Sequence, residues 1–379
     1  MIYLDNNGTT KIFEDSLQTM DHVYKYYYGN ASGIYSLGSK SKKLLEQCRV
    51  KMGKLLNCES CEVFFTSGAT ESNNIAIRGI FSKHMEKGKH VITCNIEHPS
   101  VYETVKSLDG ADVTFVKVDN YGKVHLQDLE NAIRKDTVLV TIIMGNNEIG
   151  TLQDIKAIAK ICKRKGVHFH CDMTQTIGKY IIDLKELGVD SATGSAHKFH
   201  GPKAAGFLFL RQGTYFESCI KGGHQERNMR SGTENIPGIV AMCYSLYLTN
   251  VMIQRGKAKE IETMRNWMKE QLLKYVPDAK VNGHPTDLMY NTLSICLPVN
   301  SRKLINMLDK ENICVNTGSA CSQGKTSSVL DAIGVDPQLQ QGSLRISLGF
   351  LNTWQDCTIA VDKIVYYTKL LAWKSLNNK

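Results

Sequence analysis

Asp190-Ser-Ala-Thr-Gly-Ser-Ala-His-Lys-Phe-His-Gly-Pro-Lys203 stands at the centre of the 379-residue chain. Small and hydroxylic residues lead to Lys198, and a Gly-Pro pair then turns the chain into the apolar run 204–210. This pattern predicts a strand, a loop and a second strand. A lysine on a loop is ordinarily a solvated surface charge. On a loop that faces the ligand crevice of an α/β protein it is partly desolvated, and such a lysine can form a Schiff base with a carbonyl group.

Two further features lie upstream of this loop. The β-like run 167–172 ends in Asp172, where a cationic ring nitrogen would find its counter-ion. At 62–72 a predicted strand, Gly68 and a helix N-terminus follow one another, which turns backbone N–H groups toward an anion. Pyridoxal phosphate (PLP) needs a lysine, a carboxylate at its ring nitrogen and a phosphate cup. The sequence offers candidates for all three.

The first 250 residues alternate between β-like and helical patterns. Strands are predicted at 62–67, 90–94, 113–118, 138–144, 167–171, 191–194 and 206–210. The clearest helix has apolar residues at 155, 158, 159 and 162, one face of a 3.6-residue period. The alternation predicts an α/β fold with a mostly parallel, doubly wound sheet, whose site lies at the carboxyl ends of the strands.

The pattern changes after Asn235. A long helix over about 261–272 is followed by strands near 288–297, 313–316 and 344–348 and by a lysine-rich helix from about 360. These elements predict a smaller α+β domain that the N-terminal strand joins, with the boundary near residue 250.

Composition limits the kinds of partner. The net charge is +9, but the lysines are scattered over predicted helix faces, so we expect no nucleic-acid binding. No apolar run approaches the ~20 residues that a membrane span needs, and the N-terminus lacks the pattern of a signal peptide. We therefore expect no membrane association and a cytoplasmic location. The twelve cysteines are spread singly and predicted to be reduced, and the lone pair Cys58 and Cys61 has no companions for a zinc site.

Six motifs in order resemble one known family, the NifS/IscS-type cysteine desulfurases. They are Thr66-Ser-Gly-Ala-Thr-Glu-Ser72, Asn146-Asn-Glu-Ile-Gly150, Asp172 with Gln175, Ser195-Ala-His-Lys198, Met229-Arg-Ser-Gly-Thr233 and Gly318-Ser-Ala-Cys321. The resemblance implies the fold of type I PLP-dependent transferases, with a seven-stranded, mostly parallel sheet. It also implies a large PLP-binding domain over 16–252, and a small domain of 1–15 and 253–379 that carries a catalytic-cysteine loop at about 317–327.

The resemblance implies a role for each matching residue. Lys198 would bear the cofactor, Asp172 would pair with its ring nitrogen, Gln175 would bond its ring hydroxyl, and His98 would stack on its face as a catalytic residue. The expected phosphate ligands are Ala69, Thr70, Ser195, His197 and, from a second subunit, Thr233. Asn147, which also borders the cofactor, and Arg345 are expected to bind the substrate carboxylate. Taken without a cofactor, His98 reads as a buried helix-capping histidine.

Cys321 is the residue that the resemblance makes the nucleophile. It implies that Lys198 takes the α-proton of L-cysteine, that Cys321 attacks the substrate sulfur, and that a persulfide and L-alanine result. The expected enzyme is a homodimer that supplies sulfur for iron–sulfur clusters, through a scaffold or another acceptor protein. No resident metal is expected, although Cys321 could transiently ligate an iron–sulfur cluster.

The chain departs from the family pattern in several places. Asn7-Gly8 and Lys11 replace small apolar residues and a proline, and His224 and Asn228 replace glycines in the turn 222–229. The loop after Cys321 and the C-terminal tail are shorter than in the IscS branch. These departures favour a NifS-like assignment.

Three alternatives remain open at the level of sequence. A selenocysteine lyase would need the same cofactor site. Gly318 and Gly324-Lys-Thr326 form a near-miss for a nucleotide-binding P-loop, with five residues between the glycines instead of four. A non-catalytic docking protein of the same fold would have no chemical need for Lys198, Asp172, His98 and Cys321 together.

Overall fold

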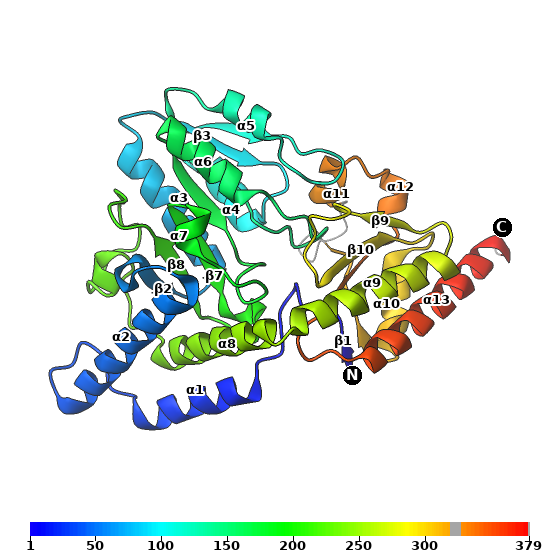
Figure 1. The fold of residues 1–379 in the computed structure, drawn as a ribbon, viewed down its shortest axis with the longest axis horizontal. Helices are drawn as coiled ribbons and strands as arrows, with labels where there is room; N and C mark the ends of the chain where they lie inside the picture. Colours follow the sequence, from blue (N-terminus) through cyan, green and yellow to red (C-terminus); the bar gives the residue numbers. More distant parts are fainter. Residues whose placement is uncertain (319–326, 378–379) are drawn as a thin grey trace.

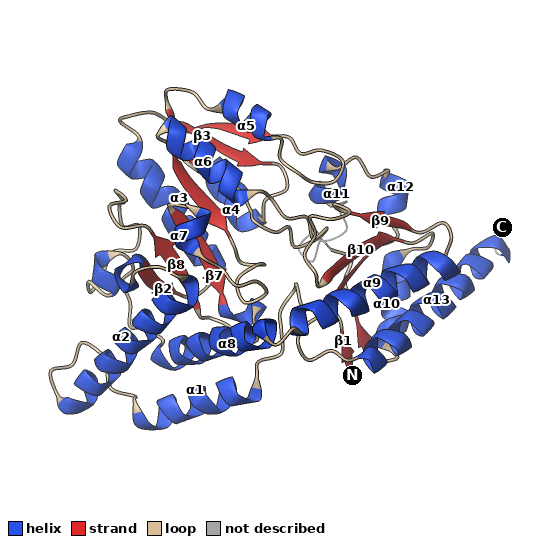
Figure 2. Ribbon diagram, viewed as in Figure 1, coloured by secondary structure: helices blue, strands red, loops and turns tan. Residues whose placement is uncertain are grey.

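The computed structural model describes residues 1–318 and 327–377. Its main feature is a seven-stranded sheet with the order β2-β8-β7-β6-β5-β3-β4 (Figures 1 and 2). Only β8 runs antiparallel to its neighbours, so the predicted mostly parallel α/β sheet is confirmed. The strands are β2 (Val63–Thr66), β3 (His90–Cys94), β4 (Asp112–Val116), β5 (Thr137–Thr141), β6 (His168–Asp172), β7 (Ser191–Ser195) and β8 (Gly206–Leu210).

Helices cover both faces of this sheet. On one face, the apolar side chains of α3 (Ala69–His84) and α4 (Pro99–Lys106) form a core with strand residues. On the other face, a larger core collects five helices besides α11 (Ser328–Ala332), and one of them, α8, also packs against α1 (Glu14–Tyr26). The five are α2 (Ser36–Leu56), α5 (Leu126–Ala132), α6 (Ile155–Lys165), α7 (Leu184–Leu187) and α8 (Ile236–Gln254). Three short 3-10 segments lie at Ser60–Glu62, Ala196–Lys198 and Glu226–Asn228.

The C-terminal part has two small sheets and its own core. The antiparallel sheet has the order β12-β10-β9, and β1 pairs in parallel with β11. Leu4 and Phe13 join the core of this part, together with apolar residues of α9, α10 and α13. The elements are β1 (Ile2–Tyr3), α9 (Lys257–Tyr275), β9 (Lys280–Asn282), β10 (Thr292–Cys296), α10 (Ser301–Asp309), β11 (Ile313–Cys314), α11 (Ser328–Ala332), α12 (Pro337–Gln340), β12 (Ser343–Ser347) and α13 (Trp354–Asn377).

Two helices connect the two parts. The first half of α8 packs into the core of the large sheet, whereas Leu248 and Met252 near its end pack against the C-terminal core. Val329 and Leu330 of α11 also contribute to the core of the large sheet. The division into 16–252 and 1–15 with 253–379 therefore stays a prediction, because residues on both sides of it share the same cores.

The expectation that no apolar run approaches the length of a membrane span is wrong. Among the described residues, α8 is a 19-residue helix that is long and apolar enough to cross a membrane by length and composition. More than half of it is buried inside the protein. The buried side of α8 contributes to the core of the large sheet, which accounts for its many apolar residues, whereas Tyr247 is exposed.

Candidate active site

The residues predicted for the site converge at the carboxyl edge of the large sheet. Asp172 ends β6, and Lys198 lies in the 3-10 segment directly after β7. Thr70 opens α3 after β2, His98 precedes α4 after β3, and Asn147 follows β5. In parallel sheets this edge is where ligands bind, because strand ends and helix N-termini face it together.

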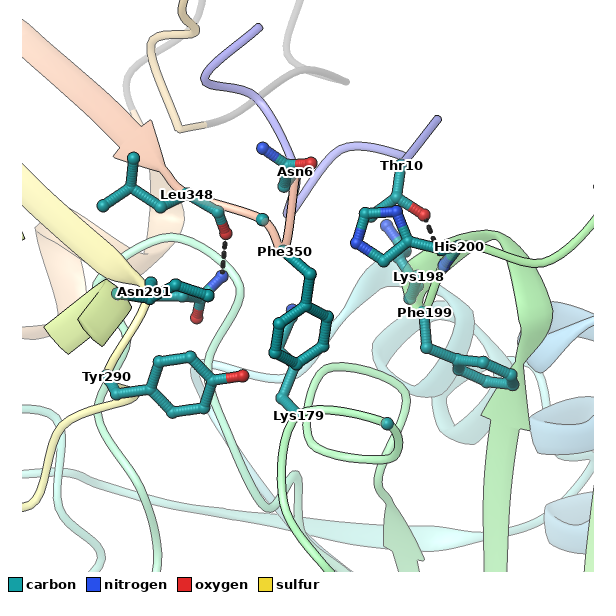
Figure 3. A pocket seen from close by; sticks show the side chains of 13 residues that line it. Asn6, Thr10, Lys179, Lys198, Phe199, His200, Tyr290, Asn291, Leu348 and Phe350 are labelled. Carbon is teal, nitrogen blue, oxygen red and sulfur yellow. Dashed lines mark hydrogen bonds between the residues drawn. The ribbon is translucent and has the colours of Figure 1, made fainter. Parts of the chain in front are cut away.

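Lys198 is held by the N-terminal segment of the chain. Its Nζ donates hydrogen bonds to the carbonyl oxygens of Asn7 and Gly8, each at 2.7 Å. Gln175 Nε2 donates to the same Asn7 carbonyl at 2.9 Å. Figure 3 shows Lys198 and Lys179 lining a small cavity with Asn6, Thr10 and Phe350. The residues before α1 therefore form one wall of the site.

Asp172 is a buried carboxylate with fixed hydrogen-bond donors. Its side chain is 2% exposed. Oδ2 accepts from Asn73 Nδ2 at 2.8 Å, and Oδ1 accepts from the backbone N–H of Thr174 at 2.9 Å. A carboxylate that is held in this way at a strand end can act as the counter-ion of a cationic ligand.

His98 caps α4, the reading that its position suggests without a cofactor. Its Nδ1 accepts from the backbone N–H of Ser100 at 3.1 Å. Burial lowers the pKa of His98, the Asp172 charge raises it, and the Lys198 charge lowers it further. The ring is therefore a neutral imidazole whose pKa responds to the charges of both Asp172 and Lys198. Helix capping leaves its ring face available, so it does not exclude the predicted stacking role.

An anion cradle lies at the start of α3. Gly68, the residue before the helix, provides no side-chain cap, so the amides of the first turn keep their donors for another acceptor. Gly68 has φ +152°, and a Cβ there would come within 3.4 Å of Ser195 Oγ. Burial and the charge of Lys198 lower the pKa of His197 to about 4, so it is neutral at pH 7. Thr233 is exposed, in the loop before α8.

The residues predicted to bind a substrate carboxylate are linked to each other. Arg345 is 2% exposed and forms an ion pair with Asp5, NH2 to Oδ1 at 2.6 Å. Its other terminal nitrogen donates to the carbonyl oxygens of Asn147 at 3.0 Å and Gly318 at 3.1 Å. Among the described residues Arg345 Nε has no hydrogen-bond partner. The guanidinium is thus a buried cation with one donor still unused.

The predicted nucleophile Cys321 lies outside the described residues. The two described residues that flank the segment carrying it, Gly318 and Ser327, lie near Asn147 and Glu148. The carbonyl oxygen of Gly318 accepts a hydrogen bond from Arg345 NH1, and Ser327 Oγ donates to Glu148 Oε2 at 2.5 Å. Both ends of this segment therefore lie at the site.

Sequence reasoning missed two polar residues that the structure brings into the site. Lys179 is buried, and its Nζ donates to Asn7 Oδ1 at 3.1 Å and Gln175 Oε1 at 2.8 Å. Asn73 binds Asp172 from α3. Lys179 follows Gln175 by four residues, and Asn73 follows the 66–72 motif directly, so proximity in sequence was an available signal.

The side chains at this edge fit PLP by their donor set. A buried carboxylate, a lysine, a neutral histidine and an uncapped helix N-terminus match a ring nitrogen, an aldehyde, a ring face and a phosphate respectively. Gly68 leaves the space between the helix and Ser195 open, which a side chain would narrow.

Comparisons with known proteins identify the family of the chain. The model of the family "Aminotransferase class-V" matches residues 2–359. Cysteine desulfurase IscS of Methanosarcina thermophila is 40% identical, and the alignment covers 96% of this chain and 90% of that protein. The IscS of Dictyoglomus turgidum is 37% identical, with 95% and 93% covered.

Solved structures give the same assignment. A NifS-like protein superposes with a TM-score of 0.92 at 36% identity, over 98% of this chain and all of that chain. A NifS-like protein from Rickettsia africae superposes with a TM-score of 0.87 at 31% identity, over 97% and 99%. Fold, motif order and near full-length similarity coincide. The chain therefore belongs to the class-V aminotransferase family and, within it, to the NifS/IscS-type cysteine desulfurases.

Proposed function

We propose that the protein is a PLP-dependent cysteine desulfurase that converts L-cysteine to L-alanine and takes the sulfur onto Cys321. The observation that carries the proposal is the convergence of Lys198, Asp172 and His98 at one sheet edge. The chain that brings them together is 40% identical to an IscS over nearly its whole length. A docking protein of this fold would need none of these residues.

The chain offers a residue for each part of the cofactor. Lys198 would hold the aldehyde, Asp172 the ring nitrogen, Gln175 the ring hydroxyl and His98 the ring face. Ala69, Thr70, Ser195 and His197 would bind the phosphate. When bound, PLP supplies an electron sink for negative charge that develops on the substrate carbons.

Substrate binding would use the buried cation beside the site. Arg345 shares its guanidinium with Asp5 and still has Nε unused among the described residues. A planar guanidinium can bond both oxygens of a carboxylate, and Asn147 lies directly beside it. Lys198 Nζ, now bonded to two carbonyl oxygens, would accept the α-proton.

Sulfur transfer would then occur at Cys321. Its thiolate attacks the sulfur of the substrate, a sulfur–sulfur bond forms, and the bond between that sulfur and the substrate Cβ breaks. The electron pair of the broken bond stays with Cβ, which takes up a proton to give alanine. The sum is enzyme thiol plus cysteine giving enzyme persulfide plus alanine.

We further propose a homodimer in which Thr233 of each subunit completes the phosphate site of the other. Thr233 is exposed in its own subunit. Large apolar side chains are exposed at the α1–α2 end of the molecule, which Figure 1 places far from α13. These side chains are Tyr24, Tyr26, Tyr28, Ile34 and Tyr35. Exposed apolar patches of this kind are typical of subunit interfaces.

The sulfur would go to an acceptor protein, with an iron–sulfur scaffold as our proposal. A cytoplasmic location is supported by the eleven described cysteines, all of which are free thiols. A selenocysteine lyase is the second candidate, because it needs the same cofactor residues, and relative turnover of the two amino acids separates them. Lys325, which a P-loop would need, lies outside the described residues.

An absorption spectrum before and after addition of L-cysteine, with alanine assayed in the same tube, tests the proposal. We expect a visible cofactor band that shifts while alanine appears. Lys198→Ala should lose the band and all turnover. Cys321→Ser should keep the band and release no sulfide, and normal sulfide release from that variant would overturn the persulfide mechanism.

A further inference from the structure

A chain of buried polar side chains runs along β6 toward the site. His168, His170 and Asp172 alternate along the strand and so share one face of the sheet. His168 Nε2 and His170 Nδ1 both bond Ser191 Oγ, at 2.9 and 2.8 Å. His170 Nε2 bonds Asn73 Oδ1 at 3.0 Å, and Asn73 Nδ2 bonds Asp172 Oδ2 at 2.8 Å.

Asn73 uses every hydrogen bond that its side chain can make. Its Nδ2 donates to Asp172 and to Ser100 Oγ, the latter at 2.9 Å. Its Oδ1 accepts from His170 and from Thr193 Oγ1, each at 3.0 Å. The residue is 0% exposed. A buried amide with all four bonds satisfied is strongly constrained in position and orientation.

The ionised carboxylate of Asp172 fixes the direction of each bond in this chain. A carboxylate only accepts, so Asn73 must present its NH2 group to Asp172 and its carbonyl oxygen to His170. His170 must then donate from Nε2. Burial lowers the pKa of His170 to about 4, so its Nδ1 is unprotonated and accepts from the Ser191 hydroxyl.

A branch of the same chain reaches His98. Because Ser100 Oγ accepts from Asn73, its own proton is free to point at His98 Nδ1, 2.8 Å away. His98 Nδ1 also accepts the Ser100 backbone N–H. The single ring proton of a neutral His98 therefore lies on Nε2. Asn73 is the junction at which the Asp172 and His98 branches meet.

We propose that Asn73 is a positioning residue, which holds the Asp172 carboxylate and, through Ser100, the His98 ring in the orientation that a bound cofactor ring needs. The inference rests on the proposed function, because it assumes that PLP lies between these two side chains. Asn73 itself touches neither cofactor nor substrate. His170 supports it from behind by occupying the amide oxygen.

Cofactor affinity of the apoprotein, titrated with PLP at pH 8, tests the role of Asn73. We expect Asn73→Ala to weaken binding by about tenfold to a hundredfold, the effect of losing one hydrogen bond to a charged group. Asn73→Asp fills the same space but faces Asp172 with a second carboxylate. This variant should therefore lose more affinity for PLP than the alanine variant does.

The control is Asn282→Ala. Asn282 is also buried and donates to Ser294 Oγ at 3.1 Å, but it lies in β9 of the C-terminal part. Its variant should bind PLP as the unmodified protein does. Binding within twofold of that level by both Asn73 variants would overturn the proposal. So would an aspartate variant that binds more tightly than the alanine variant, because packing alone would then explain the loss.

Substitutions at His170 test the chain one residue further back. Gln carries an NH2 group near the position of the histidine Nε2, so His170→Gln should keep the bond to Asn73 and retain affinity within about threefold. His170→Leu cannot donate and should weaken binding by about tenfold. Equal affinities for the two variants would contradict a role for the hydrogen bond.

Histidine nitrogen NMR of the apoprotein gives a result that does not depend on cofactor or turnover. We expect His170 and His98 to be neutral and protonated on Nε2 at pH 7, with signals assigned from His170→Gln and His98→Gln. Protonation on Nδ1 in either residue would overturn the network. An unmodified protein that binds no PLP would instead overturn the proposed function and leave this measurement interpretable.

Discussion

The hydrogen-bond partners of Lys179 provide no carboxylate that could balance a positive charge on its amine. Among the described residues, its amine bonds the amide oxygens of Asn7 and Gln175 and no other group. Burial, followed by the charges of Lys198 and Arg345, lowers the pKa of Lys179 well below its usual value of 10.5. The folded apoprotein therefore holds this amine with less affinity for a proton than the unfolded chain does.

The sign of the pH dependence follows from this difference. Below pH 10.5 and above the folded pKa, the unfolded chain binds the extra proton, so stability rises with pH across that window and is lost as pH falls. Relative to Lys179→Met, the free energy of unfolding of the apoprotein should rise with pH by up to about 1.4 kcal/mol per pH unit within that window. Urea denaturation at several pH values measures the slope, and Lys203→Met, at an exposed position, is the control. Parallel curves for Lys179→Met and the unmodified protein would show that the buried amine stays charged.

At the scale of elements, one ion pair ties the turn 222–229 to helix α2. Arg49 NH1 and NH2 bond the two carboxylate oxygens of Glu226 at 2.8 and 2.9 Å, and both side chains are buried. Glu226 also accepts from the backbone N–H of Phe65 in β2. Four non-glycine residues of this turn, His224, Glu226, Arg227 and Asn228, have positive φ. The ion pair thus stabilises a backbone conformation that residues other than glycine rarely adopt.

Removal of one partner should cost far more than removal of both. Glu226→Ala leaves the buried Arg49 guanidinium with the exposed Glu46 carboxylate as its remaining ion-pair partner among the described residues, so we expect a loss of about 3–5 kcal/mol in the free energy of unfolding. Arg49→Leu combined with Glu226→Leu should recover a substantial part of that loss. Denaturant unfolding of the single and double variants measures the difference. Glu46→Ala is the control, because Glu46 is exposed beside Arg49. Equal losses for the single and double variants would mean that the ion pair carries no such coupling.

At the scale of the whole molecule, the exposed position of Thr233 predicts sites that are shared between subunits. Thr233→Asp should repel the phosphate, and Lys198→Ala should remove the lysine, so neither variant alone should form the cofactor band. If Thr233 acts across the dimer, mixed dimers contain one intact site each. Random reassortment of subunits should then restore about a quarter of the unmodified number of sites. Absorption after mixing and reassociation measures this recovery, and no recovery would place Thr233 in its own subunit's site.

The large sheet could be predicted because its strands are apolar runs that alternate with helical patterns. The strand predicted at 288–297 is shorter in the structure, where β10 spans 292–296. β9 was missed, because a three-residue edge strand with two exposed positions has almost no pattern. The burial of α8 could not be predicted, since it depends on elements that are distant in sequence.

The same distinction applies to the site. Lys198 and Asp172 could be predicted because they follow strand ends, which meet at one edge of a parallel sheet. The contacts of Asn7 could not, because they link segments more than a hundred residues apart. The alternation of His168, His170 and Asp172 was visible in the sequence and indicates a polar face on a buried strand. Their connection through Asn73 required the position of α3.

The wall formed by residues 5–8 has a consequence for how the protein is made. Asp5 pairs with Arg345, and Asn7 bonds Thr292, so these two residues wait for partners that are synthesised 340 and 285 residues later. At ordinary rates of synthesis, Arg345 is added roughly 20–70 s after Asp5. A nascent chain can form most of the large sheet during that interval and can bring Asn7 and Gly8 to Lys198, but Asp5 does not yet have Arg345 to pair with. Premature termination after β8 but before β12 would therefore leave a polypeptide with all seven strands of the large sheet and an unfinished active site.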